Sequence, residues 1–484
     1  MSANESKSSQ PSILNIKSIP TSSAMKIESD ILEPLTFSQS ECVFEFAPKG
    51  FLHAGSCVSI GFKDNANLNT AFPYANIGIH SLVRRAVLRT TAGRVICDTE
   101  DWNYLQGCKS MFMTNGMNKE REQYLSGRQV NFELIYDESS SEKATGYGLG
   151  NNKEYDQLGG TYNLEGLSVE EHLKMSSKSE FQIKLHELFP YMKAGNTLPL
   201  FLLPNERVQV QLFWTDLTDR VALPHAGAAH VAEQLEIDQT RTKLISDHIF
   251  YDGDTMAKFE ASNKSGLTFE YIDYRLSKQS LVSRSASGVD WDAQYDTKNN
   301  VRNIGGNGMI VDKVFFAYEE PNRNCTRLLG KFGAAGMHIT GAAPQTTSAV
   351  LKSNIFFNNE YLYPQEISNP ARQFHNLKET GGMIPFITRE AYSGEGGGGL
   401  STTTKGAFEG HTIQHELASN FFWNGFNLKG QNKRVDNRGL ELHTNATEMA
   451  DLKALAIGSY TQRVWLEIRR YVIIKDGHLE CYFA

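Results

Sequence analysis

Several features that would place this chain in a familiar class are missing from its sequence. It has no run of about 18 uninterrupted apolar residues, so we expect no membrane-spanning helix. Its first 20 residues lack the basic and then apolar order of a secretory signal, which predicts a protein made in a reducing compartment. The formal net charge of −7 is opposite in sign to that of most proteins that bind nucleic acid through phosphates. We therefore expect no sequence-specific nucleic-acid binding.

Cysteine pairs at metal-binding or redox spacing are missing as well. No two of the six cysteines have C-x-x-C spacing, and most lie in apolar, strand-like sequence. They are Cys42, Cys57, Cys97, Cys108, Cys325 and Cys481. This pattern favours buried reduced thiols over a disulfide or zinc framework.

No catalytic motif is complete. His411 and His415 are four residues apart in HTIQHE, but a zinc protease needs H-E-x-x-H, and no G-x-S-x-G occurs. Carboxylate pairs such as Glu319–Glu320 are typical of solvated charges, although two facing carboxylates on a β-sandwich would suit glycoside hydrolysis. Arg469 and Arg470 lie in a strand-like segment and form no basic patch. We predict no catalytic, cofactor-binding or metal-binding residue, and hence no enzyme.

What the chain has is glycine, aromatic residues and short strand-like segments. Its 40 glycines and 11% aromatic residues favour strands and turns over helical bundles. Leu198–Trp214, LPLFLLPNERVQVQLFW, starts apolar, breaks at Pro204 and then alternates. The alternation places Val208, Val210, Leu212 and Trp214 on one side. This pattern predicts two strands around a tight corner, the second of them half-buried.

The strand-like segments form two successive series. The first comprises Cys42–Pro48, Cys57–Phe62, a hairpin over Ser81–Thr99, Glu180–Met192, Leu198–Trp214 and Leu244–Asn263, which ends in a short connector. The second comprises Phe269–Val282, Gly308–Glu320, Val350–Pro364, Asn420–Gly430 and Gln462–Phe483. Trp102–Gly127 is the best candidate for a helical insertion. Strands separated by turns, without regularly alternating helices, predict antiparallel sandwiches.

Polar segments flank and interrupt these series. Residues 1 to about 30 are rich in Ser, Lys and Glu, which predicts an arm that orders only against a partner. Polar or glycine-rich excursions at Asp137–Gly160, His338–Ala349 and Ser393–Gly406 predict exposed loops.

Three short sequence signatures follow one another along the chain, and their order is informative. Leu198, Pro199 and Leu200 enter the corner, which continues through Glu206 into the alternating strand. Asp247–Asp252 is an aromatic strand bounded by aspartates, followed by the connector DTMAKFEASN. Val464–Ala484 is a long apolar strand, a glycine turn at Gly477 and a last strand.

In this order the signatures resemble the double jelly-roll major capsid proteins of icosahedral double-stranded DNA viruses that infect eukaryotes. His248 stands where those proteins usually have an aromatic residue, so the chain looks closer to smaller relatives such as polinton-like viruses and virophages. The resemblance implies an all-β fold of two consecutive eight-stranded antiparallel jelly rolls with long loops and a few short helices. We expect a flexible arm over residues 1–34, a first roll over 35–262 and a second over 263–484.

The resemblance also implies function and partners. We expect a major capsid protein that forms homotrimers, packs as pseudo-hexameric capsomers and encloses a double-stranded DNA genome. The implied partners are neighbouring trimers, penton and minor capsid proteins, and an internal membrane where one exists. The implied location is the virion, after synthesis in the host cytoplasm and assembly in cytoplasm or nucleus. Lys7, Lys17 and Lys26 mark the arm as a candidate inward-facing tether.

Two other classes stay open on sequence grounds. One is a penton or another binding module of a virion, and the other is a carbohydrate-active β-sandwich enzyme. Oligomeric state separates them: a trimer for the major capsid protein, a pentamer for a penton, and usually a monomer or dimer for a glycosidase.

Overall fold

The structure is a computed structural model. It describes residues 25–63, 78–113, 125–126, 180–193, 197–217, 236–263, 265–282, 299–319, 332–333, 352–367, 372, 375–376, 379–380, 423–445 and 459–484. Within these ranges, no helix is both long enough and apolar enough to cross a membrane.

The first half of the chain builds two antiparallel sheets. Sheet 1 has the order β8-β5-β11-β4-β9, with β1 paired to β11, and sheet 2 has the order β2-β3-β10-β6-β7. The strands of sheet 1 are β1 (Met25–Leu32), β4 (Phe51–Leu52), β5 (Cys57–Phe62), β8 (Glu180–Lys184), β9 (Leu198–Pro199) and β11 (Ile237–Tyr251). Those of sheet 2 are β2 (Thr36–Phe37), β3 (Glu41–Glu45), β6 (Val83–Thr90), β7 (Val95–Glu100) and β10 (Val208–Trp214).

The second half repeats this arrangement. Sheet 3 has the order β12-β20-β14-β15, with β18 paired to β14 and β21 paired to β20, and sheet 4 has the order β13-β19-β16-β17. The strands of sheet 3 are β12 (Leu267–Val282), β14 (Val311–Glu319), β15 (Phe332–Gly333), β18 (Trp423–Asn427), β20 (Ser459–Lys475) and β21 (His478–Phe483). Those of sheet 4 are β13 (Asn299–Gly305), β16 (Lys352–Phe357), β17 (Glu360–Tyr361) and β19 (Leu440–Asn445).

Short helices join and cover the sheets. They are η2 (Gly78–Leu82), α1 (Trp102–Met113), α7 (Leu185–Leu188), α8 (Pro190–Lys193), η3 (Leu200–Leu202) and α9 (Gly253–Ser262). α9 links the two halves and is capped by the preceding residue, Asp252, whose carboxylate accepts the backbone N–H of Thr255. Phe259 of α9 packs edge-on against Phe51 on sheet 1.

Alternation along β10 creates the core of the first roll, as predicted. Val208, Val210, Leu212 and Trp214 are each at most 1% exposed, and the two residues Gln209 and Phe213 are half-buried on the other face. The inward residues pack among those of sheet 1, such as Val58 and Leu244. Two facing antiparallel sheets with this pattern are a β-sandwich.

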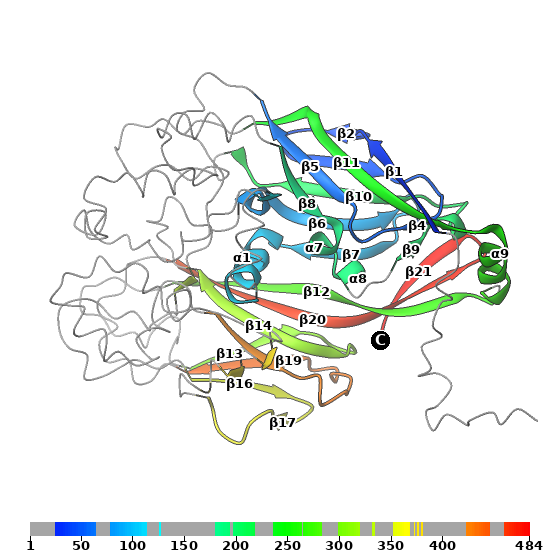
Figure 1. Ribbon diagram of the computed structural model, residues 1–484. Coiled ribbons are helices and arrows are strands. Elements are labelled where there is room, and N and C mark those ends of the chain that lie inside the picture. The colour runs from blue at the N-terminus through cyan, green and yellow to red at the C-terminus, as the bar shows by residue number, and fades with distance from the viewer. Residues whose placement is uncertain are drawn as a thin grey trace, which may run out of the picture.

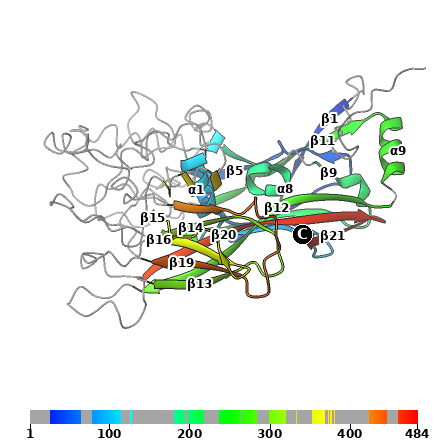
Figure 2. The ribbon, with the colours of Figure 1, turned by 90° about the horizontal axis from the view of Figure 1, so that it is seen from below.

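The core of the first roll extends into the second. Tyr271, Val472, Ile474 and Leu479 from sheet 3 belong to the same apolar cluster as the β10 residues. Figure 1 shows why, because β12 and β20 run between the first roll and sheet 4. In the turned view of Figure 2 the same two strands lie side by side along the molecule, in a register that pairs Leu267 with Ile474 and Val282 with Ser459.

The structure corrects one predicted strand. Glu180–Met192 was expected to be extended, but only Glu180–Lys184 forms β8, and two short helices follow. Glu187 accepts the backbone N–H of Lys184 and so caps the first of these helices, while Pro190 has the fixed φ that suits the first position of the second. Local capping therefore overrides the apolar alternation.

Strands β1, β13 and β19 were not recognised in the sequence. Met25–Leu32 falls in the segment expected to be an arm, but it pairs along its whole length with β11. The expected loops Asp137–Gly160, His338–Ala349 and Ser393–Gly406 lie outside the described residues, as do Lys7 and Lys17.

Candidate functional site

A band of charged residues joins the two rolls. It lies where β12 and β20 of the second roll face β7 and α1 of the first. We call it the seam and define it by Asp101, Asp273, Lys278, Arg463 and Arg470. Asp273, Arg463 and Arg470 are at most 9% exposed, which is unusual for charged side chains unless they are paired.

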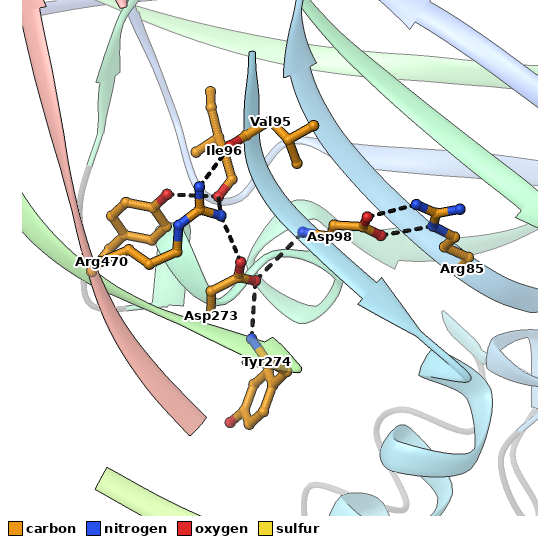
Figure 3. A network of polar contacts seen from close by, with 8 residues as sticks. Arg85, Val95, Ile96, Asp98, Asp273, Tyr274 and Arg470 are labelled. Atoms are coloured by element: carbon orange, nitrogen blue, oxygen red, sulfur yellow. Dashed lines mark hydrogen bonds and ion pairs between the residues drawn. The ribbon is translucent and has the colours of Figure 1, made fainter. Parts of the chain in front are cut away.

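Arg470 and Asp273 form the centre of the seam (Figure 3). Arg470 donates to the Asp273 carboxylate over 2.8 Å and to the backbone carbonyls of Ile96 and Val95 over 2.9 and 3.0 Å. Asp273 also accepts the backbone N–H of Asp98 over 3.4 Å. Both partners of this ion pair come from the second roll, and both reach backbone of the first.

A second set of ion pairs lies at the other end of the seam. Asp101, which directly follows β7, accepts from Arg463 over 2.9 Å and from Lys278 over 3.0 Å. Arg463 also lies over the ring of Tyr104 in α1, 3.8 Å from its centre, in a cation–π contact. One carboxylate of the first roll thus holds one cation from β12 and one from β20 of the second.

The two carboxylates respond differently to burial. Burial raises the pKa of Asp273 to about 6, because the nearby Arg470 only partly offsets the loss of solvation. Burial also acts on Asp101, but Arg463 and Lys278 outweigh it and hold the pKa of that carboxyl below its usual range. One cation is therefore too few for a fully enclosed carboxylate, and two suffice at the partly open end.

The corner singled out in the sequence receives the last hairpin of the second roll. Asn205 donates to the carbonyl of Asp476 over 3.3 Å, and His478 Nδ1 lies 2.8 Å from Glu206 Oε1. Gly477 has φ +78°, and a Cβ there would lie 2.6 Å from the Asn205 side chain. The turn therefore needs glycine both for its backbone angle and for its close approach to the corner.

β1 presents a different surface. Its outward side chains Met25, Ile27 and Ile31, which we call the β1 face, are 55%, 52% and 67% exposed. Glu28 and Asp30 point to the other side, like the buried residues opposite them, His248 and Ser246. Lys49 lies 2.7 Å from Asp30 on that inner side. Apolar residues thus face solvent and charged residues face inward, the reverse of an ordinary surface strand.

The other sequence candidates show no assembled chemistry in the described part of the chain. His411 and His415 lie outside it. Within it, no three His, Cys, Asp or Glu side chains gather in a way that could hold a metal ion. Cys42, Cys57 and Cys97 are free and buried, as interpreted, and Cys481 is free and half-buried. The sequence analysis gave no role to any residue of the seam, and it considered Arg470 only as one of two adjacent arginines.

The comparisons with known proteins concern the fold. No family model matches the chain, and no curated protein matches its sequence. Solved structures do match. The quasi-atomic model of the PBCV-1 virus capsid has 12% identity and a TM-score of 0.51, over 96% of this chain and 97% of that one. The cryo-EM structure of the Sputnik virophage has 10% identity and a TM-score of 0.54, over 98% and 92%.

A third match is the VP54 protein of PBCV-1, fitted into a reconstruction of Sputnik, with 11% identity and a TM-score of 0.51 over 96% of this chain and 97% of that one. All three alignments run through both rolls. The chain therefore has the double jelly-roll fold of these viral capsid proteins, as the resemblance implied.

Proposed function

We propose that this chain is the major capsid protein of an icosahedral double-stranded DNA virus. The observation that carries the proposal is the alignment of 96–98% of the chain, both rolls included, with capsid structures of PBCV-1 and Sputnik. A single-roll penton protein would match one half. Among the described residues, no group of His, Cys, Asp and Glu side chains could hold the metal ion of a metal-dependent enzyme.

The proposed mechanism is assembly by burial of surface. Two similar rolls side by side give one subunit two of the six sides of a near-hexagonal block, so three subunits complete it. The seam makes this possible, because its paired charges fix the angle between the rolls before subunits meet. An obligate trimer interface would bury some 2,000–5,000 Å².

The proposal extends to domains and partners. Residues 35–262 and 263–484 would act as the two rolls and residues 1–34 as an arm, of which Met25–Leu32 is the β1 strand. Partners would be neighbouring trimers, penton and minor capsid proteins, and an internal membrane where the virion has one. The location would be the virion, following synthesis in the host cytoplasm. The net charge of −7 suits a shell that encloses DNA without binding its sequence.

Light scattering behind a sizing column tests the proposal. A trimer has a mass of three times 54.1 kDa, or about 162 kDa, and should persist on dilution. Electron microscopy of that species should then show a hexagonal outline. A pentamer would favour a penton protein instead, and a monomer that cleaves glycosides would favour the enzyme class.

A further inference from the structure

His248 is a fully buried histidine beside the edge of sheet 1. Its side chain is 0% exposed, and it lies in β11 between Glu28 of β1 and Leu52 of β4, which are the residues opposite it on either side. Among the described strands β1 pairs with β11 alone, whereas β4 also pairs with β9. Figure 1 places β1 beside β11 at the periphery of the first roll. β1 is therefore the less firmly fixed of the two strands that flank the imidazole.

The hydrogen bonds of His248 suit the neutral imidazole. Nδ1 lies 3.0 Å from the carbonyl oxygen of Lys49, which can only accept, so Nδ1 carries the proton and donates it. Nε2 lies 3.2 Å from the Ser246 hydroxyl, which can donate to it. Gly50, with φ +56°, packs so closely on β11 that a Cβ there would lie 2.9 Å from the carbonyl oxygen of Ile249. The Lys49 carbonyl is thus held in place, and both ring nitrogens are satisfied without a second proton.

The charged groups around the ring offset its burial only in part. Asp30 of β1 lies 3.7 Å from Nε2, but the same carboxylate lies 2.7 Å from the Lys49 ammonium. Asp247 of β11 adds negative charge, while Glu28 is paired with a lysine of its own strand. Burial is the largest influence and lowers the pKa of His248 below its ordinary value, against the smaller opposing effects of the Lys49 carbonyl and the two aspartates. The structure therefore resists protonation of this ring.

β1 makes few contacts that would hold it against such a change. None of its eight residues is buried, and within the strand Leu32 alone packs against the apolar core of the first roll. Its other contacts include the hydrogen bond from Ser29 to Asp247 and the ion pair between Asp30 and Lys49. Local opening of a protein begins in elements with few buried apolar contacts. Release of β1 would therefore admit water beside His248 with little loss of packing.

We infer that His248 and β1 form an acid-sensitive latch, in which protonation of the buried imidazole releases β1 from β11. At neutral pH the ring is uncharged and satisfied, and β1 stays paired. Below pH 6.5, the ordinary pKa of a histidine, the released form takes up a proton that the paired form resists. The stability of the pairing is therefore fully present above that pH and is lost as pH falls below it.

This inference concerns a single chain and does not rest on the proposed function. Release would unpair residues 25–32 and leave the corresponding edge of β11 without its neighbour. The apolar cores of both rolls contain no residue of β1 apart from the partly buried Leu32. Acid would thus alter one edge of sheet 1 while both rolls stay folded.

Hydrogen exchange of the full-length protein at about pH 7.5 and about pH 5.0 tests the inference, after correction for the effect of pH on exchange itself. In wild type the amides of β1 should open at least about fivefold more often at the lower pH, and the limit set by one histidine is about thirtyfold. Amides of β10, in the core of the same roll, should show no such increase. Carboxyls of ordinary pKa, ~3.9–4.3, stay mostly charged over this range.

His248→Gln is the main variant, because glutamine offers a donor to Lys49 and an acceptor to Ser246 but binds no proton. Its β1 amides should open equally often at both pH values. His248→Phe, an aromatic ring that cannot be protonated, carries the same expectation and serves if the glutamine variant does not fold. His443→Gln, which alters a half-buried histidine on β19, is the control and should respond to acid as wild type does.

The inference is wrong if acid increases the opening of β1 in wild type no more than that of β10. It is also wrong if a folded His248→Gln or His248→Phe protein keeps the acid response, because another group would then cause it. Loss of the response in His443→Gln would contradict it as well. None of these outcomes depends on whether the chain is a trimer, so light scattering decides the proposed function separately.

Discussion

The seam and the β1 face depart in opposite ways from the usual distribution of side chains, in which charged residues lie at the surface and apolar residues lie inside. The seam places charged residues inside the molecule, with Asp273 and Arg470 at 3% and 9% exposure. The β1 face places apolar residues outside, with Ile31 at 67% exposure. Both departures carry a cost in an isolated chain, through desolvation in one case and exposed apolar surface in the other.

The difference lies in whether the chain contains the compensating partner. Every charged residue of the seam has an opposite charge within about 3 Å, contributed by the same chain. The β1 face has no cover among the described residues. Buried charges that are paired within one chain indicate a role in holding the shape of that chain. Exposed apolar side chains that no described residue covers indicate contact with another molecule.

Val210→Asp should cause the largest loss of stability, because Val210 is an apolar residue in the core. Val210 is fully buried between sheets 1 and 2, so an aspartate there would be an enclosed charge without a partner. We expect a loss of several kcal/mol and no folded soluble protein, measured by circular dichroism and sizing. Gln209→Ser on the outer face of the same strand should fold; a folded Val210→Asp protein would show that the strand register is wrong.

Arg470→Met should come next, because it removes one partner of the central ion pair. Asp273 would stay enclosed without its cation, which typically costs about 3–5 kcal/mol. Urea unfolding of the purified variant measures the loss. Arg275→Met, which alters an exposed arginine on β12, is the control. Equal stability of the two variants would mean that the seam pair does not hold the rolls together.

The pH dependence of the seam should be smaller and has a definite sign. A carboxyl whose pKa is raised to about 6 binds a proton more readily in the folded chain than in the unfolded chain, where its pKa is ~3.9. Its unfavourable contribution at neutral pH should therefore fade as pH falls from above 6 to about 4.

The measurement is urea unfolding of wild type and Asp273→Asn across that pH range. The stability of wild type relative to the variant should increase as pH falls. A relative stability that decreases instead would mean that Arg470 dominates over burial and holds the pKa of Asp273 low.

Ile31→Ser should have the smallest effect on the folded chain. Because Ile31 is already 67% exposed, its replacement should change unfolding free energy by no more than about 0.5 kcal/mol. Thermal unfolding of the dilute protein would check this. A loss near 2 kcal/mol would show that Ile31 is already buried in the dilute protein, and the contrast with the seam would disappear.

Much of the fold was readable in the sequence because alternation is a local signal. The β6–β7 hairpin, with Gly93 at φ +82°, and the β20–β21 pair with its turn at Gly477 were both predicted from residues within each segment. The corner and β10 were predicted in the same way. The double roll itself came from the order of three signatures, which carry more information together than any one does alone.

The misses have physical reasons. β1 alternates apolar and polar residues, but it does so beside a polar segment, and its strand state depends on pairing with β11 more than 200 residues later. β13, Asn299–Gly305, is mostly polar and is fixed by pairing with β19. The role of Arg470 could not be predicted from its neighbours in sequence, because only the three-dimensional fold brings Val95 and Ile96 to it.

Leu479 of β21 has a consequence for the order of events during synthesis. It is fully buried in the core of the first roll, although its strand is made long after β11. Roughly 230 residues separate Leu244 from Leu479, so at ~5–20 residues per second the ribosome needs about 10–50 s to supply that side chain. During this interval the nascent first roll leaves the ribosome with an apolar gap, which is the kind of surface that a chaperone binds.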